Sequence, residues 1–388
     1  MGKFGKKNHV KLDPLAYNIL LLGESKIGKT TLAKEVCEKL TNGIDGGYLF
    51  LELGQERGAD GIEGINYINC PEWNMDYDET MNAAGFIDVC EDIIENKTTD
   101  YPNLRVVIWD TYDQLINIAE QEAIRLWNKE CREKGQPDKV TKSINAAWGG
   151  FGRGEQKARE LMFDTMSRLR LVGVAVFVIG HVKTKDITDV VSGETYQTLT
   201  SDQAQSYFNA LKKNLHFLGL AYIDRKIIKQ KSGKKNMNGK DEYVNKVSEE
   251  TRKIKFRDDN YAVDSGSRFA EIVPEIDFTA DDFIKALTDA IECERSKSGK
   301  SLEESVAEEK AAEEKAAKKI ADNEKKMHED KERNELIDKI IAWFTENKSD
   351  IGKIKPVLAK CKELGYGNPK EIATVEHAKA VYAMTLAD

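Results

Sequence analysis

Residues 18–36 join a short apolar run to a loop of glycine, lysine and threonine, in the order NILLLGESKIGKTTLAKEV. Gly23 and Gly28 bracket the pattern G-x-x-x-x-G-K-T. Glycines at these positions let successive main-chain N–H groups converge on phosphate oxygens, and a helix that begins near Lys29 directs its positive end at the same anion. The pattern predicts a phosphate-binding loop that consists of Gly23, Glu24, Ser25, Lys26, Ile27, Gly28, Lys29, Thr30 and Thr31.

Two side chains of this loop have specific expected roles. The Lys29 ammonium group is expected to reach the β- and γ-phosphates of a nucleotide, and the Thr30 hydroxyl to bind Mg²⁺. ATP and Mg²⁺ are therefore the expected cofactors. The flanking residues favour this interpretation, because 19–22 have the composition of a buried strand and 31–40 that of a helix. The alternative is a strand–turn–helix with a purely structural role.

Carboxylates follow two further apolar runs. Asp110 ends the run LRVVIWD, and we expect it to hold the magnesium ion through a water molecule, facing Thr30. Glu56 lies just past the apolar run 47–53 and is the first candidate for the base that orients an attacking water; Glu52 is the second. The alternative is that both glutamates are solvated carboxylates at the end of a strand.

His181 follows a third strongly apolar run, 172–180, and Lys183 and Lys185 lie just beyond it. A polar side chain at the tip of a core strand is well placed to sense the γ-phosphate and to pass its state to the segment that follows. That segment, 183–203, is polar and lacks periodicity, which predicts a long irregular loop with a function. The alternative is a histidine whose hydrogen bonds are satisfied within the core.

These residues need a scaffold in which apolar strands end at one edge of a sheet. Further strands are expected at 65–70, 217–231, 240–247 and 251–257, and helices at 81–95, 112–134, 155–171 and 280–294. The alternation of strands and helices predicts a doubly wound, mainly parallel α/β sheet, and the later strands predict an antiparallel β extension.

Two basic or aromatic segments are candidates for contact with nucleic acid. The glycine-rich loop AAWGGFGRG carries Trp148, Phe151 and Arg153, which could stack on bases or bind phosphates; a tryptophan that anchors the loop to the core is the alternative. Residues 225–257 contain 12 Lys and Arg against 4 Asp and Glu, although edge lysines also protect strands from aggregation. Arg257 and Arg268 are alternative candidates to reach the nucleotide of a neighbouring subunit.

Composition sets the broad class of the protein. The chain has 388 residues and a formal net charge of −8, so any binding of a polyanion must depend on a local basic surface. No apolar run approaches the length of a membrane helix, and the basic N-terminal segment lacks the apolar core of a secretory signal. The six cysteines are scattered without metal-binding spacing, which favours reduced thiols in a cytoplasm.

Composition also predicts three domains. Residues 1–295 form the α/β domain, 296–333 a charged linker, and 334–388 a small helical domain. The linker is rich in Ala, Glu and Lys at i, i+4 spacing and lacks the apolar seam of a coiled coil, so a solvated helical spacer is expected. The small domain regains apolar periodicity over three short helices and is expected to dock a partner protein or DNA.

Taken in order, the segments GESKIGKT, LELGQERG, LRVVIWDT, AAWGG and VFVIGHVK resemble the phage-encoded RecA-like ATPases, AAA-type nucleotide-binding proteins found beside phage single-strand annealing and single-strand-binding genes. The resemblance covers about residues 15–275. It implies a RecA-like P-loop core, a homo-oligomer and a place in the host cytoplasm. It also implies catalytic roles for Lys29, Glu56, Asp110 and His181, although this chain has ELGQE where that family has a shorter D-x-E.

The resulting hypothesis is an ATP-hydrolysing protein that binds single-stranded DNA in phage recombination or annealing. Its partners would be single-stranded DNA and, through the C-terminal helices, a single-strand-binding or annealing protein. A replicative helicase or helicase loader is the first alternative and predicts strand unwinding. A small-molecule kinase or a nucleotide-switched scaffold is the second, and the scaffold predicts nucleotide binding with negligible turnover.

Overall fold

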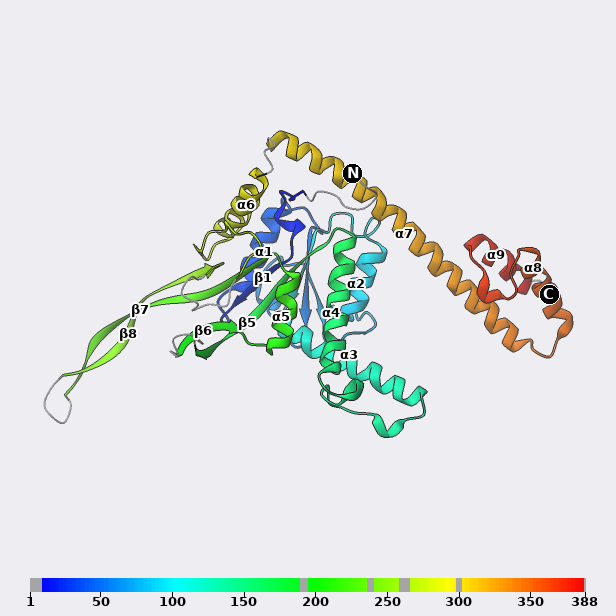
Figure 1. The fold of residues 1–388 in the computed structure, drawn as a ribbon, viewed down its shortest axis with the longest axis horizontal. Helices are drawn as coiled ribbons and strands as arrows, with labels where there is room; N and C mark the ends of the chain where they lie inside the picture. Colours follow the sequence, from blue (N-terminus) through cyan, green and yellow to red (C-terminus); the bar gives the residue numbers. More distant parts are fainter. Residues whose placement is uncertain (1–8, 189–194, 236–240, 258–265, 298–301, 387–388) are drawn as a thin grey trace. The chain divides into compact units, whose positions relative to one another are not determined.

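The computed structural model describes residues 9–188, 195–235, 241–257, 266–297 and 302–386 (Figure 1). Contacts group the chain into two units, Met1–Ile93 with Tyr101–Ala311 and Ile94–Asp100 with Ala312–Asp388. The first unit contains the sheet and the residues of the predicted nucleotide site. The second contains the C-terminal helices. The three domain boundaries expected from composition stay predictions.

The described strands form one nine-stranded sheet in the order β3-β2-β4-β5-β1-β7-β8-β9, with β6 paired to β5. The strands from β3 to β7 in this order are parallel, and β6, β8 and β9 pair antiparallel with their neighbours. Their bounds are β1 Ile19–Gly23, β2 Tyr48–Leu53, β3 Tyr67–Cys70, β4 Val106–Asp110, β5 Ala175–Thr188, β6 Thr195–Ser201, β7 Phe217–Lys235, β8 Asp241–Lys255 and β9 Glu275–Asp277.

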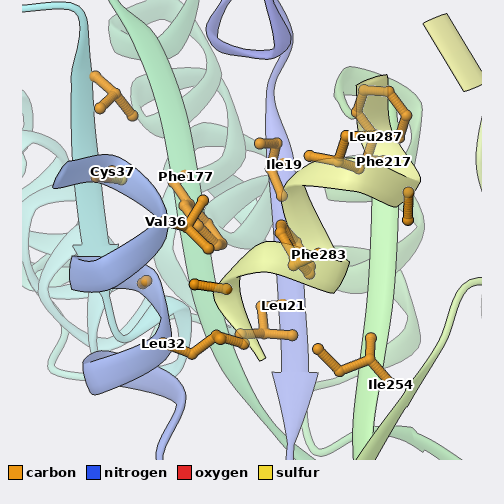
Figure 2. Close-up of a cluster of buried hydrophobic side chains, with 14 of the residues drawn as sticks. Ile19, Leu21, Leu32, Val36, Cys37, Phe177, Phe217, Ile254, Phe283 and Leu287 are labelled. Carbon is orange, nitrogen blue, oxygen red and sulfur yellow. The ribbon is translucent and has the colours of Figure 1, made fainter. Parts of the chain in front are cut away.

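Helices cover both faces of the parallel strands. Every residue of β1 is buried, as expected for a central parallel strand with covered faces. Ile19 and Leu21 pack with α1 and α6 in one core cluster, and the alternation of a strand directs Leu20 and Leu22 to the opposite face (Figure 2). The helices of this unit are α1 Lys29–Leu40, α2 Phe86–Glu95, α3 Tyr112–Glu133, α4 Arg153–Leu171, α5 Gln205–Asn214 and α6 Ala280–Ser296.

The mainly parallel α/β fold predicted from the sequence is confirmed, but three of its details were wrong. The segment 183–203 is not an irregular loop, because β5 continues to Thr188 and pairs with β6. Residues 240–247 and 251–257 are not separate strands, since β8 is continuous across them. Helix α5, between β6 and β7, was not expected.

Strands β7 and β8 continue past their neighbours as a two-stranded ribbon (Figure 1). Its basic character is part of the DNA-binding hypothesis. The sequence SGKKNMNG at 232–239 predicts a hairpin turn between these strands; 232–235 belong to β7, 236–239 lie outside the described ranges, and the side chains of 227–248 are not described either.

In the second unit, the last part of α7 Leu302–Glu346 packs with α8 Ile351–Glu363 and α9 Val375–Thr385. The linker and the first C-terminal helix are thus one continuous helix. The buried residues of this small core are Ile337, Ile340, Val357, Cys361, Ile372, Ala378 and Val381. Among the described helices, none has the length and apolar character needed to cross a membrane.

Candidate nucleotide site

The register of the parallel strands brings the predicted site residues to one edge of the sheet. Gly23 at the end of β1 lies beside His181 in β5. Asp110 at the end of β4 lies beside Ile179, two residues before His181, and on its other side beside Glu52 in β2. Because β5 lies between β1 and β4, the His181 position falls between the phosphate-binding loop and Asp110.

The loop 23–31 has the backbone that its glycines predict. Gly28 adopts φ +105°, and Gly23 lies so close to β7 that a β-carbon would approach the Ala221 side chain and carbonyl at 3.0 Å. Ile27 is buried and anchors the loop in the core. The exposed residues of the loop are Ser25, Lys26 and Thr31. The loop is therefore exposed to solvent over a buried apolar base, as a phosphate site requires.

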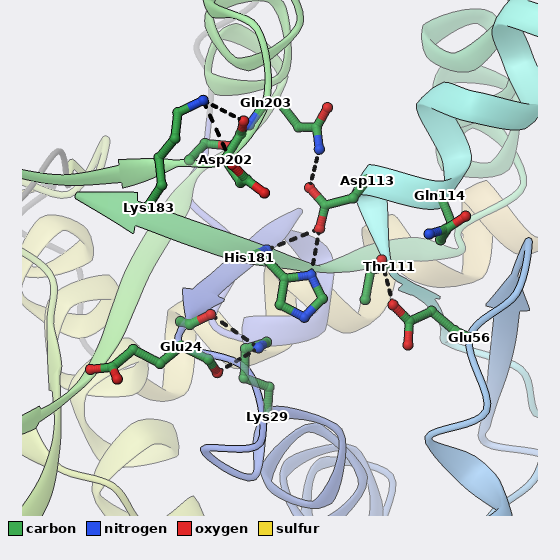
Figure 3. Close-up of polar contacts among 12 residues, drawn as sticks. Glu24, Lys29, Glu56, Thr111, Asp113, Gln114, His181, Lys183, Asp202 and Gln203 are labelled. Atoms are coloured by element: carbon green, nitrogen blue, oxygen red, sulfur yellow. Dashed lines mark hydrogen bonds and ion pairs between the residues drawn. The ribbon is translucent and has the colours of Figure 1, made fainter. Parts of the chain in front are cut away.

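Lys29 folds back onto its own loop (Figure 3). Its Nζ donates to the carbonyl oxygens of Gly23 at 3.1 Å and Glu24 at 3.0 Å. Burial lowers the pKa of Lys29, and the negative charge of Asp110 opposes this shift. A phosphate that enters the loop would exchange two neutral acceptors for charged ones, which form stronger hydrogen bonds with an ammonium group.

Thr30, Asp110 and Glu52 surround a small volume that Gly58 keeps open. Thr30 Oγ1 donates to Asp110 Oδ2 at 2.7 Å. A β-carbon at Gly58 would lie 3.4 Å from Thr30 Oγ1, 3.7 Å from Asp110 Oδ2 and 3.8 Å from Glu52 Oε1. Glu52 is 1% exposed, and its Oε2 has no hydrogen-bond partner in the described part of the chain. One hydroxyl and two carboxylates are a donor set that Mg²⁺ accepts together with nucleotide phosphates and water.

Both carboxyl groups are held at an electrostatic cost. Burial raises the pKa of Asp110 to about 6, and the charge of Glu56 adds to this, whereas the hydrogen bond from Thr30 opposes it. Burial also raises the pKa of Glu52, and its hydrogen bond from the Ala59 N–H, 2.5 Å long, acts in the other direction. Two adjacent buried acids of this kind favour a bound cation.

Glu56, the first candidate for the base, lies on the loop after β2 beside the end of β4. Its Oε1 accepts a hydrogen bond from Thr111 Oγ1 at 3.4 Å, and the peptide bond between Asp110 and Thr111 is cis. The side chain is partly exposed, unlike that of Glu52. Of the two candidates, Glu56 therefore has access to a water molecule, and Glu52 faces the volume beside Asp110.

His181 connects the site to the hairpin of β5 and β6. Asp113, in the first turn of α3, accepts from the His181 main-chain N–H at 3.1 Å and pairs with its Nδ1 at 2.7 Å through the same oxygen, Oδ2 (Figure 3). The other oxygen of Asp113 accepts from Gln203 Nε2 at 2.5 Å. Lys183 donates to the Asp202 carbonyl at 2.7 Å and so joins the two strands at the base of the hairpin. Asp113 thus fixes the orientation of the His181 ring, and the sensor role of His181 stays a prediction.

Sequence reasoning missed several residues of the site. Asp113 and Gln203 follow no motif, and Gly58 stands in a loop whose glycines look alike in sequence. Glu24 was assigned only to the phosphate loop, yet its carboxylate lies 3.5 Å from Arg225 at the base of the β7–β8 ribbon. Sequence separation hides this pair, because the two residues come from opposite ends of the α/β domain.

The glycine-rich loop before α4 separates two aromatic residues that the sequence grouped together. Trp148 donates from Nε1 to the Ala123 carbonyl at 2.9 Å and packs against Trp127, so it has the anchoring contacts of the alternative. Phe151 is 100% exposed at φ +54°, between glycines that also have positive φ. Ser206 Oγ donates to Glu155 Oε2 at 3.1 Å, so the start of α4 lies beside the residues that follow β6.

The two arginines considered for a neighbouring nucleotide lie elsewhere. Arg257 donates to the Ala270 carbonyl at 2.7 Å, and Arg268 donates to the Lys213 carbonyl. Lys213 is near the end of α5, just before β7 begins. Both arginines thus lie at the edge of the sheet opposite their own chain's phosphate loop. Their proposed reach to another subunit stays a prediction.

Together, the mainly parallel α/β fold, the loop at the end of β1 and the Thr30–Asp110 pair define a P-loop nucleotide-binding protein. A family model described as an AAA domain matches residues 15–253, and the chain therefore belongs to this family of P-loop ATPase domains. Among solved structures it is similar to a KaiC-like protein of the hyperthermophilic archaeon Pyrococcus horikoshii OT3, with 13% sequence identity, a TM-score of 0.31, and coverage of 64% of this chain and 87% of that chain. The comparison with curated proteins gives no match.

Proposed function

We propose that the protein hydrolyses Mg·ATP and couples this to the binding of single-stranded DNA, in the recombination or annealing reactions of a bacteriophage. The observation that carries the proposal is the continuous series of contacts from His181 through Asp113 to Gln203. These contacts join the middle of β5, beside the phosphate loop, to the residues that follow β6 at the base of the β5–β6 hairpin. We propose that a change at the γ-phosphate is passed through these contacts to the base of the hairpin.

In the proposed reaction, Lys29 binds the β- and γ-phosphates, and Glu56 orients and deprotonates the attacking water. Thr30 and Asp110 would hold a magnesium ion, and the Glu52 carboxylate would add negative charge beside it. An ion held there would supply positive charge to the phosphate oxygens during hydrolysis. His181 donates a hydrogen bond to the γ-phosphate while Asp113 fixes the orientation of its ring.

The proposed DNA-binding surface combines the β5–β6 hairpin with the loop that presents Phe151. Because the Phe151 side chain is fully exposed, a base can stack on it without disturbing the core. Such stacking tolerates different nucleotide sequences. Arg153, one helical turn or less away, supplies a cation for the phosphate backbone. The basic β7–β8 ribbon would extend the same kind of contact.

We further propose that the protein acts as a homo-oligomer in the host cytoplasm, and that the C-terminal helices dock a single-strand-binding or annealing partner. The small core of α7, α8 and α9 gives these helices a fold of their own on which a docking surface can be built.

The test is ATP turnover by the full chain without polymer, with single-stranded DNA and with duplex DNA. We expect stimulation by single strands, and loss of turnover in all three conditions for Lys29→Ala. Phe151→Ala should weaken binding to a fluorescent oligonucleotide by roughly tenfold or more, because base–aromatic stacking contributes about 1–3 kcal/mol. The matched control is Tyr77→Ala, which removes a 63% exposed aromatic elsewhere on the surface.

Three results would contradict the proposal. Turnover that survives Lys29→Ala would place hydrolysis outside the phosphate loop. Equal weakening by Phe151→Ala and Tyr77→Ala would remove Phe151 from the DNA surface. ATP-dependent unwinding of a forked duplex would favour the helicase alternative over recombination or annealing.

A further inference from the structure

A second pocket lies at the opposite edge of the sheet from the phosphate loop. It has a volume of about 470 Å³ and is lined near the starts of three adjacent parallel strands, β1, β5 and β7, by Asn18, Ala175 and His216. Gly23 lies five residues along β1 from Asn18 in the pocket wall, a distance of roughly 16 Å at about 3.3 Å per residue. The pocket is therefore distinct from the nucleotide site, and nothing in the proposed function uses it.

The charged side chains that line this pocket are mostly cationic. Lys11, Arg170 and Arg268 contribute positive charge, and the one carboxylate among the lining residues is Glu294. Glu294 already pairs with Lys297 at 2.8 Å. Arg170, at the exposed end of α4, has no ion pair within the described ranges, and Arg268 bonds only to a main-chain carbonyl there. Within the described part of the chain, neither of these two guanidinium groups forms an ion pair with a carboxylate.

His216 adds a directed donor. Its Nδ1 accepts a hydrogen bond from the Asn18 main-chain N–H at 3.3 Å. A main-chain N–H can only donate, so Nδ1 carries the lone pair and the neutral ring has its proton on Nε2. Burial, together with the charges of Arg170 and Arg268, lowers the pKa of His216 to about 4. The ring is neutral at pH 7, and both guanidinium groups are close enough to affect it.

The wall of the pocket formed by residues 9–12 is held in place by its own contacts. The Leu12 N–H donates to both carboxylate oxygens of Glu309 at 3.0 Å, and Arg295 Nη1 donates to the Val10 carbonyl at 2.8 Å. The nearby acid Glu308 lies 3.7 Å from Arg295. These acids are thus engaged with the wall and with Arg295, and the cationic groups of the pocket remain available to a ligand.

We propose that this pocket binds a small phosphorylated molecule, with its phosphate oxygens held by the guanidinium groups of Arg170 and Arg268 and by the Nε2–H of His216. Arginine forks match phosphate oxygens in pairs, and a phosphate group accepts more hydrogen bonds than a carboxylate. The volume is within the range of pockets that hold small ligands. The site is independent of ATP hydrolysis at the phosphate loop.

The test is calorimetric titration of pyrophosphate into the full chain that carries Lys29→Ala, so that the phosphate loop contributes little. We expect one binding site to remain, and Arg170→Gln in that background to weaken it about tenfold or more. Arg168→Gln is the matched control, because Arg168 is two residues away on the same helix and pairs with Glu91 at 3.0 Å. Imidazole NMR gives a second readout, in which pyrophosphate shifts the Nε2 signal that His216→Phe removes.

Several results would overturn the proposal. They are the absence of pyrophosphate binding in the Lys29→Ala chain, equal effects of Arg170→Gln and Arg168→Gln, and an unchanged His216 signal at saturation. Parallel titrations with ADP and with a short single-stranded oligonucleotide distinguish the sources of phosphate. If only the oligonucleotide shifts the His216 signal, the pocket is a nucleic-acid contact, and the small-molecule proposal is wrong. If the protein does not hydrolyse ATP, these titrations and NMR signals still test the pocket.

Discussion

The two ends of β1 carry opposite kinds of electrostatic site. At its carboxyl end, Asp110 and Glu52 are buried acids beside an open volume, and burial raises the pKa of each. At its amino end, Arg170 and Arg268 lie near a neutral histidine. The first arrangement is suited to a cation and the phosphates that accompany it, and the second to an anion alone. The same parallel sheet thus positions side chains at both of its edges, and the chemical types of those side chains determine which ligand each edge suits.

The strongest test of this contrast is Asp110→Asn. We expect turnover to fall by about 100-fold or more, because the magnesium ion loses a charged anchor. We also expect the nucleotide-free protein to become more stable at pH 7, by up to about 3 kcal/mol, because a carboxyl group with a folded pKa of about 6 and an unfolded pKa near 3.8 is ionised there against its preference. Urea unfolding and a turnover assay measure the two effects.

The sign of this effect can be checked by pH. Because the folded pKa of Asp110 is the higher one, the folded state binds the proton more tightly, and wild-type stability should fall as pH rises from about 4 to about 6. The difference between wild type and Asp110→Asn should grow over the same window and then level off. A variant that is less stable than wild type at pH 7 would show that the carboxyl end is not held at a cost, and the contrast would fail.

The second test separates the two glutamates. Glu56→Gln should lower kcat by roughly 100-fold with little change in nucleotide affinity, since general-base catalysis contributes about 10²–10⁴. Glu52→Gln should instead raise the Mg²⁺ concentration required for nucleotide binding, because Glu52 faces the volume beside Asp110. Fluorescent nucleotide binding at varied Mg²⁺ gives this readout without hydrolysis. The reverse assignment would follow if Glu52→Gln lost turnover at saturating Mg²⁺ and Glu56→Gln kept it.

The parts of the fold that could be predicted are those in which local pattern determines structure. The segments that form β1, β4 and the first part of β5 are continuous apolar runs. Burial on both faces of a parallel sheet requires this composition. The segment 183–203 was misjudged because polar residues occur at both alternating positions, so periodicity gave no strand signal. In the structure, β5 continues to Thr188 and pairs with β6 in a hairpin.

The candidate site shows the same limit. The residues of the phosphate loop are consecutive, so a motif identifies them, whereas Gly58, Asp113 and Gln203 are brought together by folding from separate segments. The amino-end pocket is the extreme case, because its lining residues range from 9 to 294. No local sequence pattern could therefore predict this pocket. The sequence therefore points to the candidate nucleotide site and gives no indication of the amino-end pocket.

A third test fills the volume beside the acids. Gly58→Ala would place a methyl group within 3.4–3.8 Å of the three oxygens, so we expect the Mg²⁺ concentration for half-maximal turnover to rise by about tenfold. Gly61→Ala is the matched control, because a β-carbon at Gly61 meets no atom within 4 Å. Neither glycine has a positive φ, so backbone strain does not distinguish the two variants. Equal Mg²⁺ requirements for both variants would mean that the open volume is not where the ion binds.

The smallest expected effect concerns communication away from the carboxyl end. Gln203→Ala removes the 2.5 Å hydrogen bond to Asp113 Oδ1 but leaves the pair between Asp113 Oδ2 and His181 intact. Basal turnover should therefore stay within about threefold of wild type, since the orientation of the His181 ring is kept by its pair with Oδ2. Stimulation by single-stranded DNA should be reduced, because the segment after β6 then loses its side-chain contact with Asp113.

Gln205→Ala is the control for this variant, since Gln205 lies two residues further along and contacts Asn209 and Lys185 without reaching Asp113. The ratio of stimulated to basal turnover is the quantity to compare. If Gln203→Ala and Gln205→Ala gave the same ratio as wild type, the contact to Asp113 would only hold the hairpin in place. The carboxyl end would then bind and hydrolyse its nucleotide without reporting on it, and the coupling to DNA would have to follow another route, such as the ion pair between Glu24 and Arg225.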